Sequence, residues 1–249
     1  MRPIVRKNDR QLEAMRTSGR MLREVFDALR ERVVAGALDT DVDRFAREKI
    51  EKMRAVPAFL GYNGFPATIC CSINSEVVHG VPRGRRVKEG DIVGIDIGLI
   101  YEGYHADCAY TFAIGKISAE ARHLLEVAKE SLWRGIDKMR EGNRLGDVSA
   151  AIQQCAEANG FGVVREYTGH GIGREMHEPP ELPNFGKPGT GKRLREGVVI
   201  AIEPMINQGT SETRVLDDTW TVVTADGSLS AHYEHTVVVT TGEPEILTA

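Results

Sequence analysis

An internal repeat is the feature of this 249-residue sequence that most constrains its fold. Residues 88–96 (KEGDIVGID) align with residues 195–203 (REGVVIAIE) at an offset of 107. An Asp-Val pair recurs at positions 41–42 and 147–148, at an offset of 106. Repetition at a nearly fixed offset indicates two related halves, each of them one supersecondary unit that packs against the other.

The hydrophobic pattern predicts the same order of elements in both halves, two helices followed by strands. The expected helices cover residues 9–34, 39–53, 125–139 and 145–158. The stretch 55–66 contains glycines and prolines and is expected to be a loop. We therefore expect one α+β domain over residues 1–249, with halves of about 1–114 and 115–249 related by a pseudo-twofold axis.

Charge and cysteine content argue against several classes of protein. With 32 Lys and Arg against 36 Asp and Glu, the net charge is -4, whereas binding nucleic acid through its phosphates requires a basic face. The basic run at residues 83–88 is expected to be a solvated turn. No segment approaches the ~18 uninterrupted apolar residues of a membrane helix. Four cysteines without a C-x-x-C pair indicate reduced thiols, which favours the cytoplasm.

Two carboxylates of the first half are expected to face each other. Asp96 lies between Ile95 and Ile97 in an apolar strand, where an unpaired charge would be very costly. Asp107 follows the turn-like residues 101–104, on the strand that should return as a hairpin. Two buried acids that face each other require a cation.

The second half repeats this arrangement. Glu203 ends an apolar strand and Glu234 begins another. The pseudo-twofold axis is expected to bring Asp96 and Glu203 towards one centre, and two divalent cations would balance the four carboxylates. With His170, which lies in the glycine-rich segment TGHGIG, the donors favour Mn²⁺, Fe²⁺ or Co²⁺. Two such ions can bridge and deprotonate a water molecule for a hydrolysis.

The motifs GIDIG, HAD, TGHGIG, IEPM and YEHT resemble those of the type I methionine aminopeptidases. The resemblance extends over essentially the whole chain. It implies a pita-bread (creatinase/aminopeptidase) fold of two pseudo-twofold-related halves, with an antiparallel sheet core and helices outside. It also implies a dinuclear metalloaminopeptidase that removes the initiator methionine from nascent polypeptides and favours a small second residue. Hydrolysis would proceed through a water or hydroxide bridged by the two metals.

The resemblance assigns metal ligands to five positions. Asp96 and Asp107 would bind one ion and His170 the other. Glu203 and Glu234 would help to hold both, and Glu203 would also serve as the general base.

Further residues match substrate-contacting positions of the family. His79 and His177 correspond to two active-site histidines that are not ligands but contact the substrate and take part in catalysis. The methionine pocket corresponds to Phe59, Tyr62, Phe65, Cys70 and Trp220. Phe59 departs from the family, which has a smaller residue at that place, and Met176 stands where an aromatic residue is frequent. His105, His232 and His235 flank the site, and the pattern alone does not decide which of them supports it.

Spacing places the chain within the family. Only 26 positions separate His177 from Glu203, which leaves no room for the helical insertion of type II enzymes. The first helix is expected to begin near residue 9, as in the short bacterial form. The resemblance implies the N-terminal peptides of nascent proteins as substrates. Transient contact with the ribosome is a separate expectation, which the sequence does not decide. We expect a monomer with neither a membrane nor a sequence-specific nucleic-acid partner.

Three other functions fit parts of the sequence. Residues 186–192 match the start of a phosphate-binding loop, but Arg193 replaces the required Ser or Thr. A catalytically silent binding domain of the same fold would tend to lack metal ligands, whereas all five positions are filled. The runner-up is a proline-directed peptidase of the same fold, which usually carries an additional N-terminal domain for which there is no room before residue 9.

Overall fold

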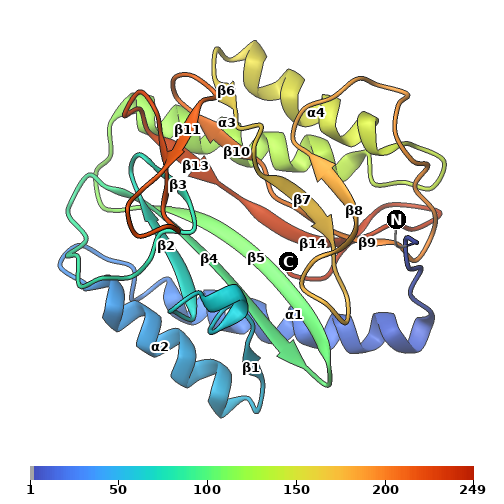
Figure 1. The fold of residues 1–249 in the computed structure, drawn as a ribbon, viewed down its shortest axis with the longest axis horizontal. Coiled ribbons are helices and arrows are strands. Elements are labelled where there is room, and N and C mark those ends of the chain that lie inside the picture. Colours follow the sequence, from blue (N-terminus) through green and yellow to red (C-terminus); the bar gives the residue numbers. More distant parts are fainter. Residues whose placement is uncertain (1–2) are drawn as a thin grey trace.

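The computed structural model describes residues 3–249 and builds them around one large antiparallel sheet with strands from both halves (Figure 1). Its order is β1-β4-β5-β14-β9-β7-β8, with β2 beside β4 and β15 beside β14. The strands cover Val56–Pro57 (β1), Ile69–Ile73 (β2), Ile92–Tyr101 (β4), Tyr104–Ala113 (β5), Thr168–Gly171 (β7), Glu178–Pro183 (β8), Val199–Ile202 (β9), Glu234–Val238 (β14) and Glu245–Ile246 (β15).

Two smaller sheets of three strands each are also formed within the described residues, in the orders β13-β10-β6 and β11-β12-β3. Their strands cover Glu76–Val78 (β3), Gly162–Val163 (β6), Met205–Asn207 (β10), Thr213–Val215 (β11), Val222–Thr224 (β12) and Ser230–His232 (β13). The pairing of β3 with β12 joins the two halves of the chain. It therefore brings together His79, just after β3, and Trp220, just before β12.

The helices follow the predicted order. Within residues 3–249 they are Asp9–Leu29 (α1), Asp39–Lys52 (α2), Ala119–Asp137 (α3) and Leu145–Ala158 (α4). Helix α3 begins six residues before the predicted start because Ser118 caps it by accepting a hydrogen bond from the Ala121 N–H. The predicted loop 55–66 contains the short strand β1 and one 3-10 turn, Tyr62–Gly64 (η1). No helix among the described residues is both long and apolar enough to span a bilayer.

The ends of α1 show what the periodicity can and cannot predict. Asn8 and Gln11 form a reciprocal capping box at its start. The predicted end at residue 34 is wrong, because the helix stops at Leu29. Val33 is nevertheless buried, since the turn after the helix returns it to the core through the bond from Val33 N–H to Leu29 O. Val33 therefore matches the apolar spacing of a helix although it lies in the turn that follows the helix.

The helices cover one face of the large sheet, α1 and α2 against one half and α3 and α4 against the other (Figure 1). The first core packs α1 and α2 on residues such as Ile95 and Ile97 of β4. The second packs α3 and α4 on residues such as Ile200 and Ile202 of β9. Since side chains alternate along a strand, Asp96 and its neighbours at even positions of β4 face away from these helices.

The internal repeat corresponds to equivalent strands. Residues 88–96 lead into β4 and residues 195–203 into β9, and these strands flank the central pair β5·β14 on either side. The antiparallel pairing of β5 with β14 sets Glu234 opposite Ala109 at the middle of the sheet. The fold is therefore the expected pita-bread arrangement of two pseudo-twofold-related halves.

Candidate active site

Two adjacent rows of residues cross the face of the sheet that the helices leave uncovered. In the first row, the register places Asp96 opposite Ala109 and Ala109 opposite Glu234. Glu203 immediately follows Ile202, whose partner is His235, so it extends this row beyond Glu234. The small side chain of Ala109 leaves space between the three carboxylates.

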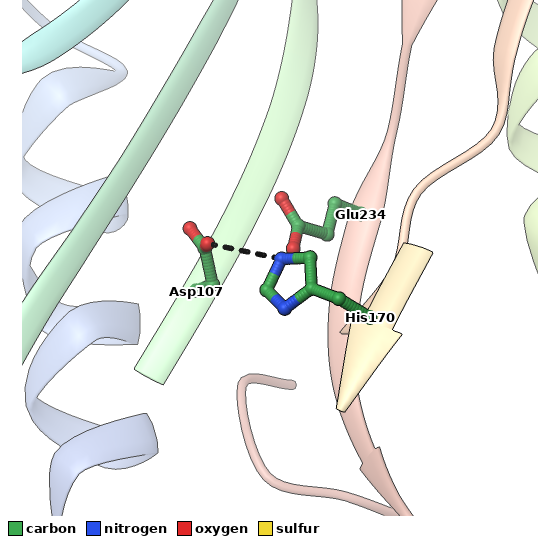
Figure 2. A group of neighbouring side chains, drawn as sticks. All are labelled: Asp107, His170 and Glu234. Carbon is green, nitrogen blue, oxygen red and sulfur yellow. Dashed lines mark ion pairs between the residues drawn. The ribbon is translucent and has the colours of Figure 1, made fainter. Parts of the chain in front are cut away.

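The second row lies two residues further along the strands. Asp107 pairs with Gly98 on one side, and on the other its backbone N–H and C=O both bond to the hydroxyl of Thr236, at 3.1 and 2.8 Å. Thr236 pairs with Ala201, and Ala201 pairs with His170. The structure therefore brings all five predicted ligands to one place, and Figure 2 shows Asp107, His170 and Glu234 pointing towards one another. One potential ligand atom from each of these three residues lies within 4.8 Å of those of the other two.

Hydrogen bonding fixes which nitrogen of His170 carries the proton. Nδ1 lies 3.0 Å from the carbonyl oxygen of Gly171, which can only accept, so Nδ1 is the donor. Burial, followed by the nearby His177, lowers the pKa of His170 to about 3, so the ring is neutral at pH 7. Its Nε2 therefore presents a lone pair, and this faces Oε1 of Glu203 at 3.5 Å and Oδ2 of Asp107 at 3.9 Å.

The buried carboxylates repel one another when they are ionised. Burial, followed by the charges of Asp107 and Glu203, raises the pKa of Asp96 well above its usual range. Burial and the charge of Asp107 likewise raise the pKa values of Glu203 and Glu234. Burial raises the pKa of Asp107 itself to about 7, although the N–H of Cys108 opposes the rise. Ionised carboxylates are thus costly at this place when only protein atoms surround them.

These donors fit divalent cations. The lone pair of His170 repels ionised carboxylate oxygens unless a positive charge lies between them, and oxygen donors with one imidazole suit Mn²⁺, Fe²⁺ or Co²⁺. Oδ1 of Asp96 and Oε1 of Glu234 are buried and lack a hydrogen-bond partner among residues 3–249. Metal ligation would satisfy both atoms and would lower the cost of keeping the carboxylates ionised.

His79 and His177 lie beside this cluster but are not part of it. Both line the same cavity as the five predicted ligands, a hollow of about 180 Å³. The ring of His177 lies 4.2 Å from that of His170, and its Nδ1 shares a hydrogen bond of 2.7 Å with the hydroxyl of Tyr62. Burial, followed by His177, lowers the pKa of His79 to about 4. A neutral imidazole has one N–H to donate to a substrate.

The apolar end of the cavity contains the predicted pocket residues. Phe65 and Trp220 pack edge to face at 5.2 Å, and Cys70 is buried beside them. The full lining at this end comprises Phe59, Tyr62, Asn63, Phe65, Cys70, Met176 and Trp220. A pocket with aromatic and sulfur-containing walls beside a polar cluster can hold an apolar side chain.

The three histidines that flank the site in sequence have different environments in the structure. His232 is buried, and its Nε2 lies 3.8 Å from Oε2 of Glu203, so it is next to the cluster. His235 alternates to the opposite face, where it bonds to the hydroxyl of Thr248. His105 bonds instead to the backbone at Gly173.

Sequence reasoning missed Tyr167, whose ring packs edge to face on His79 at 5.4 Å. A tyrosine just before a glycine-rich segment has no pattern of its own. Only the position of β7 relative to the end of β3 reveals the contact.

Fold and site together define a metal-dependent hydrolase. A family model for the metallopeptidase family M24 matches residues 13–241. The chain is 51% identical over 245 residues to a methionine aminopeptidase of Clostridium perfringens, with 98% of each chain covered. The chain therefore belongs to metallopeptidase family M24, among the methionine aminopeptidases.

Solved structures agree with this assignment. The crystal structure of a methionine aminopeptidase from Thermotoga maritima superposes with a TM-score of 0.97 at 43% identity, covering 99% of both chains. An Xaa-Pro dipeptidase from Bacillus anthracis superposes over 98% of this chain and 61% of its own, with a TM-score of 0.79 at 21% identity. That second likeness shows a common fold and nothing more.

Proposed function

We propose that this chain removes the N-terminal methionine of polypeptides by metal-dependent hydrolysis and favours a small second residue. The observation that carries the proposal is the lone pair of His170 Nε2, which faces two carboxylates beside an apolar slot. The similarity over almost the whole chain to methionine aminopeptidases supports the choice of substrate.

Two divalent ions would be held by the five residues of the two rows. We assign Asp96 and Asp107 to one ion, His170 to the other, and Glu203 and Glu234 to both. The ions would polarise the scissile carbonyl and supply a water of lowered pKa. Mn²⁺, Fe²⁺ and Co²⁺ all suit this donor set.

The side chains of the protein would divide the remaining work. Glu203 would accept the proton of the attacking water at a carboxylate oxygen and return it to the leaving amine. His79 and His177 would donate hydrogen bonds to the amide as charge develops on it, and such preorganised donors lower the barrier. The carboxylates around the cluster would also attract the free amino group of the substrate.

The apolar end of the cavity would select the first residue. Burying a methionine side chain there would contribute roughly 2–3 kcal/mol. Phe65 and Trp220 form rigid walls, so a branched side chain would collide with them. Phe59 narrows the slot further, since it lines the same space.

The deciding experiment is hydrolysis of Met-Ala-Ser by purified protein after chelation and after return of each metal. We expect no turnover after chelation and recovery with at least one of Mn²⁺, Fe²⁺ and Co²⁺. A panel with Ala-Pro peptides tests the proline-directed alternative. Cleavage of Ala-Pro in preference to Met-Ala would refute the proposed substrate.

Further expectations accompany this function. We propose one catalytic domain over residues 1–249, acting as a monomer in the cytoplasm with transient ribosome contact. The four cysteines are all free thiols, in keeping with a reducing compartment. Sedimentation equilibrium and cosedimentation with ribosomes would test the monomer and the ribosome contact.

A further inference from the structure

His79 has a backbone conformation that histidine rarely adopts. Its φ is 57°, in the left-handed region that favours glycine. Residues in such conformations persist only where the surrounding structure fixes them, and they concentrate at functional sites. The contacts that fix His79 are therefore part of what places its imidazole at the cavity.

The residue after His79 is pressed against β2. The carbonyl of Gly80 accepts a 2.7 Å hydrogen bond from the N–H of Cys71, and the N–H of Gly80 donates to Oγ of Ser72 at 3.3 Å. A Cβ at Gly80 would lie 2.3 Å from the carbonyl oxygen of Cys71, so only glycine allows this approach. These contacts fix the backbone on the C-terminal side of His79.

The guanidinium of Arg85 binds groups on three segments that precede His79 in the sequence. Its Nη1 donates to both carboxylate oxygens of Glu76, at 2.5 and 2.6 Å, and its Nε donates to Oδ2 of Asp39 at 2.9 Å. Its Nη2 donates to the carbonyl oxygen of Cys71 at 2.8 Å. One side chain thus joins the start of β3, the start of α2 and the strand β2 on which Gly80 rests.

The two acids that hold Arg85 are themselves buried. Asp39 is 0% exposed and accepts further bonds from the N–H groups of Gly84 and Arg85, at 2.8 and 2.9 Å. Glu76 is 7% exposed, and one of its oxygens also accepts from Ile73 N–H. A charged cluster of this kind is costly to break. Removal of Arg85 leaves the buried Asp39 without a cationic partner, and Glu76 keeps only Arg83, whose Nη2 donates to its Oε1 at 2.9 Å.

Glu76 and Arg85 bracket His79 along the chain. Their ion pair joins the two ends of the segment 76–85, and the Cys71 peptide groups bind its middle and its end. We propose that Arg85, held by Asp39 and Glu76, is a positioning residue that fixes the backbone of segment 76–85 and so aims the imidazole of His79 at the cavity. The activity readout rests on the proposed function, whereas the exchange readout below does not.

A double-mutant cycle tests whether Arg85 acts through His79. Arg85→Met should lower kcat for Met-Ala-Ser by about tenfold or more, since small misplacement of a catalytic group is costly. KM should change less than about threefold. In a His79→Ala background the same substitution should change kcat less than about twofold, because the group that it misplaces is already absent. An equal loss in both backgrounds, or no loss of kcat in the first, would refute the positioning role.

A control and a second variant separate positioning from simple loss of stability. Arg16→Met removes an arginine that binds Glu245 through two hydrogen bonds, at 2.6 and 2.8 Å, and neither residue lines the cavity. It should lower the melting temperature without lowering kcat at a temperature where the protein is folded. Should Arg85→Met fail to fold, Arg85→Lys retains the charge but cannot serve all three partners, and we expect an intermediate loss of kcat. A kcat unchanged in Arg85→Lys would then count against the proposal.

Hydrogen exchange followed by mass spectrometry measures the segment without reference to activity. Arg85→Met should accelerate exchange in peptides covering residues 71–85 by at least tenfold, whereas Arg16→Met should not. If exchange is faster in Arg85→Met but the wild-type protein does not hydrolyse Met-Ala-Ser, the proposed function is refuted and the role of Arg85 in fixing segment 76–85 stands. Unchanged exchange in Arg85→Met would refute the proposal that Arg85 fixes this segment.

Discussion

The hydroxyl oxygen of Tyr62 lies 2.7 Å from Nδ1 of His177, and the two side chains share a hydrogen bond. The sequence placed Tyr62 only in the wall of the methionine pocket. This bond occupies Nδ1 and so leaves Nε2 of His177 for a substrate. Tyr62 therefore lines the cavity and also orients the imidazole of His177, for which we propose a catalytic role.

Replacing Tyr62 by Phe removes this hydrogen bond and retains the ring. We expect kcat for Met-Ala-Ser to fall by about 5–10-fold, the effect of one neutral hydrogen bond, with little change in KM. Steady-state kinetics beside a Tyr101→Phe control would measure it. A rise in KM at constant kcat would show instead that the ring acts only as a pocket wall.

Removing the metals or their ligands should abolish hydrolysis. Asp107→Asn and Glu203→Gln should each lower kcat by at least ~10³, since a metal-activated water is the main source of reactivity. Return of Mn²⁺ to chelated wild-type protein should raise its melting temperature, because binding to the folded state alone stabilises it. Near-normal turnover in either variant or after chelation would contradict the dinuclear mechanism.

His79→Ala and His177→Ala distinguish catalytic donors from metal ligands. Each should lose about 10²–10³ in kcat, the usual effect of removing a preorganised donor. Metal content, measured by inductively coupled plasma mass spectrometry, should remain that of the wild-type protein. Loss of an ion from either variant would show that the histidine is a ligand.

Substrate choice tests the apolar slot. We expect kcat/KM for Met-Ala-Ser to exceed that for Leu-Ala-Ser by about tenfold or more, because the branch at Cγ meets the rings of Phe65 and Trp220. Met-Lys-Ser should be poor because of its large second residue, and acetyl-Met-Ala-Ser should not be cut. Equal cleavage of the leucine or acetylated peptide would overturn the proposed specificity.

Gly169 tests the packing of the strand that carries His170. An added Cβ would lie 2.4 Å from the carbonyl oxygen of Ala201, so Gly169→Ala should lower the free energy of unfolding by about 1–3 kcal/mol. Gly242→Ala, where a Cβ meets nothing within 4 Å, should change it by less than about 0.5 kcal/mol. Urea denaturation of both variants measures the difference, and equal stabilities would refute the close packing of β7 on β9.

Much of the fold was predictable from the chain because the signals are local. Helix α4 has the predicted limits, since its apolar residues recur at helical spacing throughout. Two helix boundaries were predicted wrongly. The end of α1 was placed too late because Val33 is buried in a turn, and the start of α3 was placed too late because its capping residue, Ser118, lies outside the apolar pattern. The pairing of residues far apart in the chain is not a local property, and it was predictable only in so far as the repeat implied it.

Residue types and their strand contexts were sufficient to predict which carboxylates gather in the cluster, because each half carries two acids in apolar strands and a buried charge needs a partner. How these side chains meet depends on contacts that form only in the folded chain. The register of β5 on β14 sets Glu234 in line with Asp96 across Ala109, and the carbonyl of Gly171 turns the lone pair of His170 towards Glu203. The bond from His170 to Gly171 is local, whereas the register of β5 on β14 and the pairing of β7 with β9, which brings Glu203 close to His170, join segments far apart in the chain. Their geometry is fixed by the packing of the whole sheet against its helices.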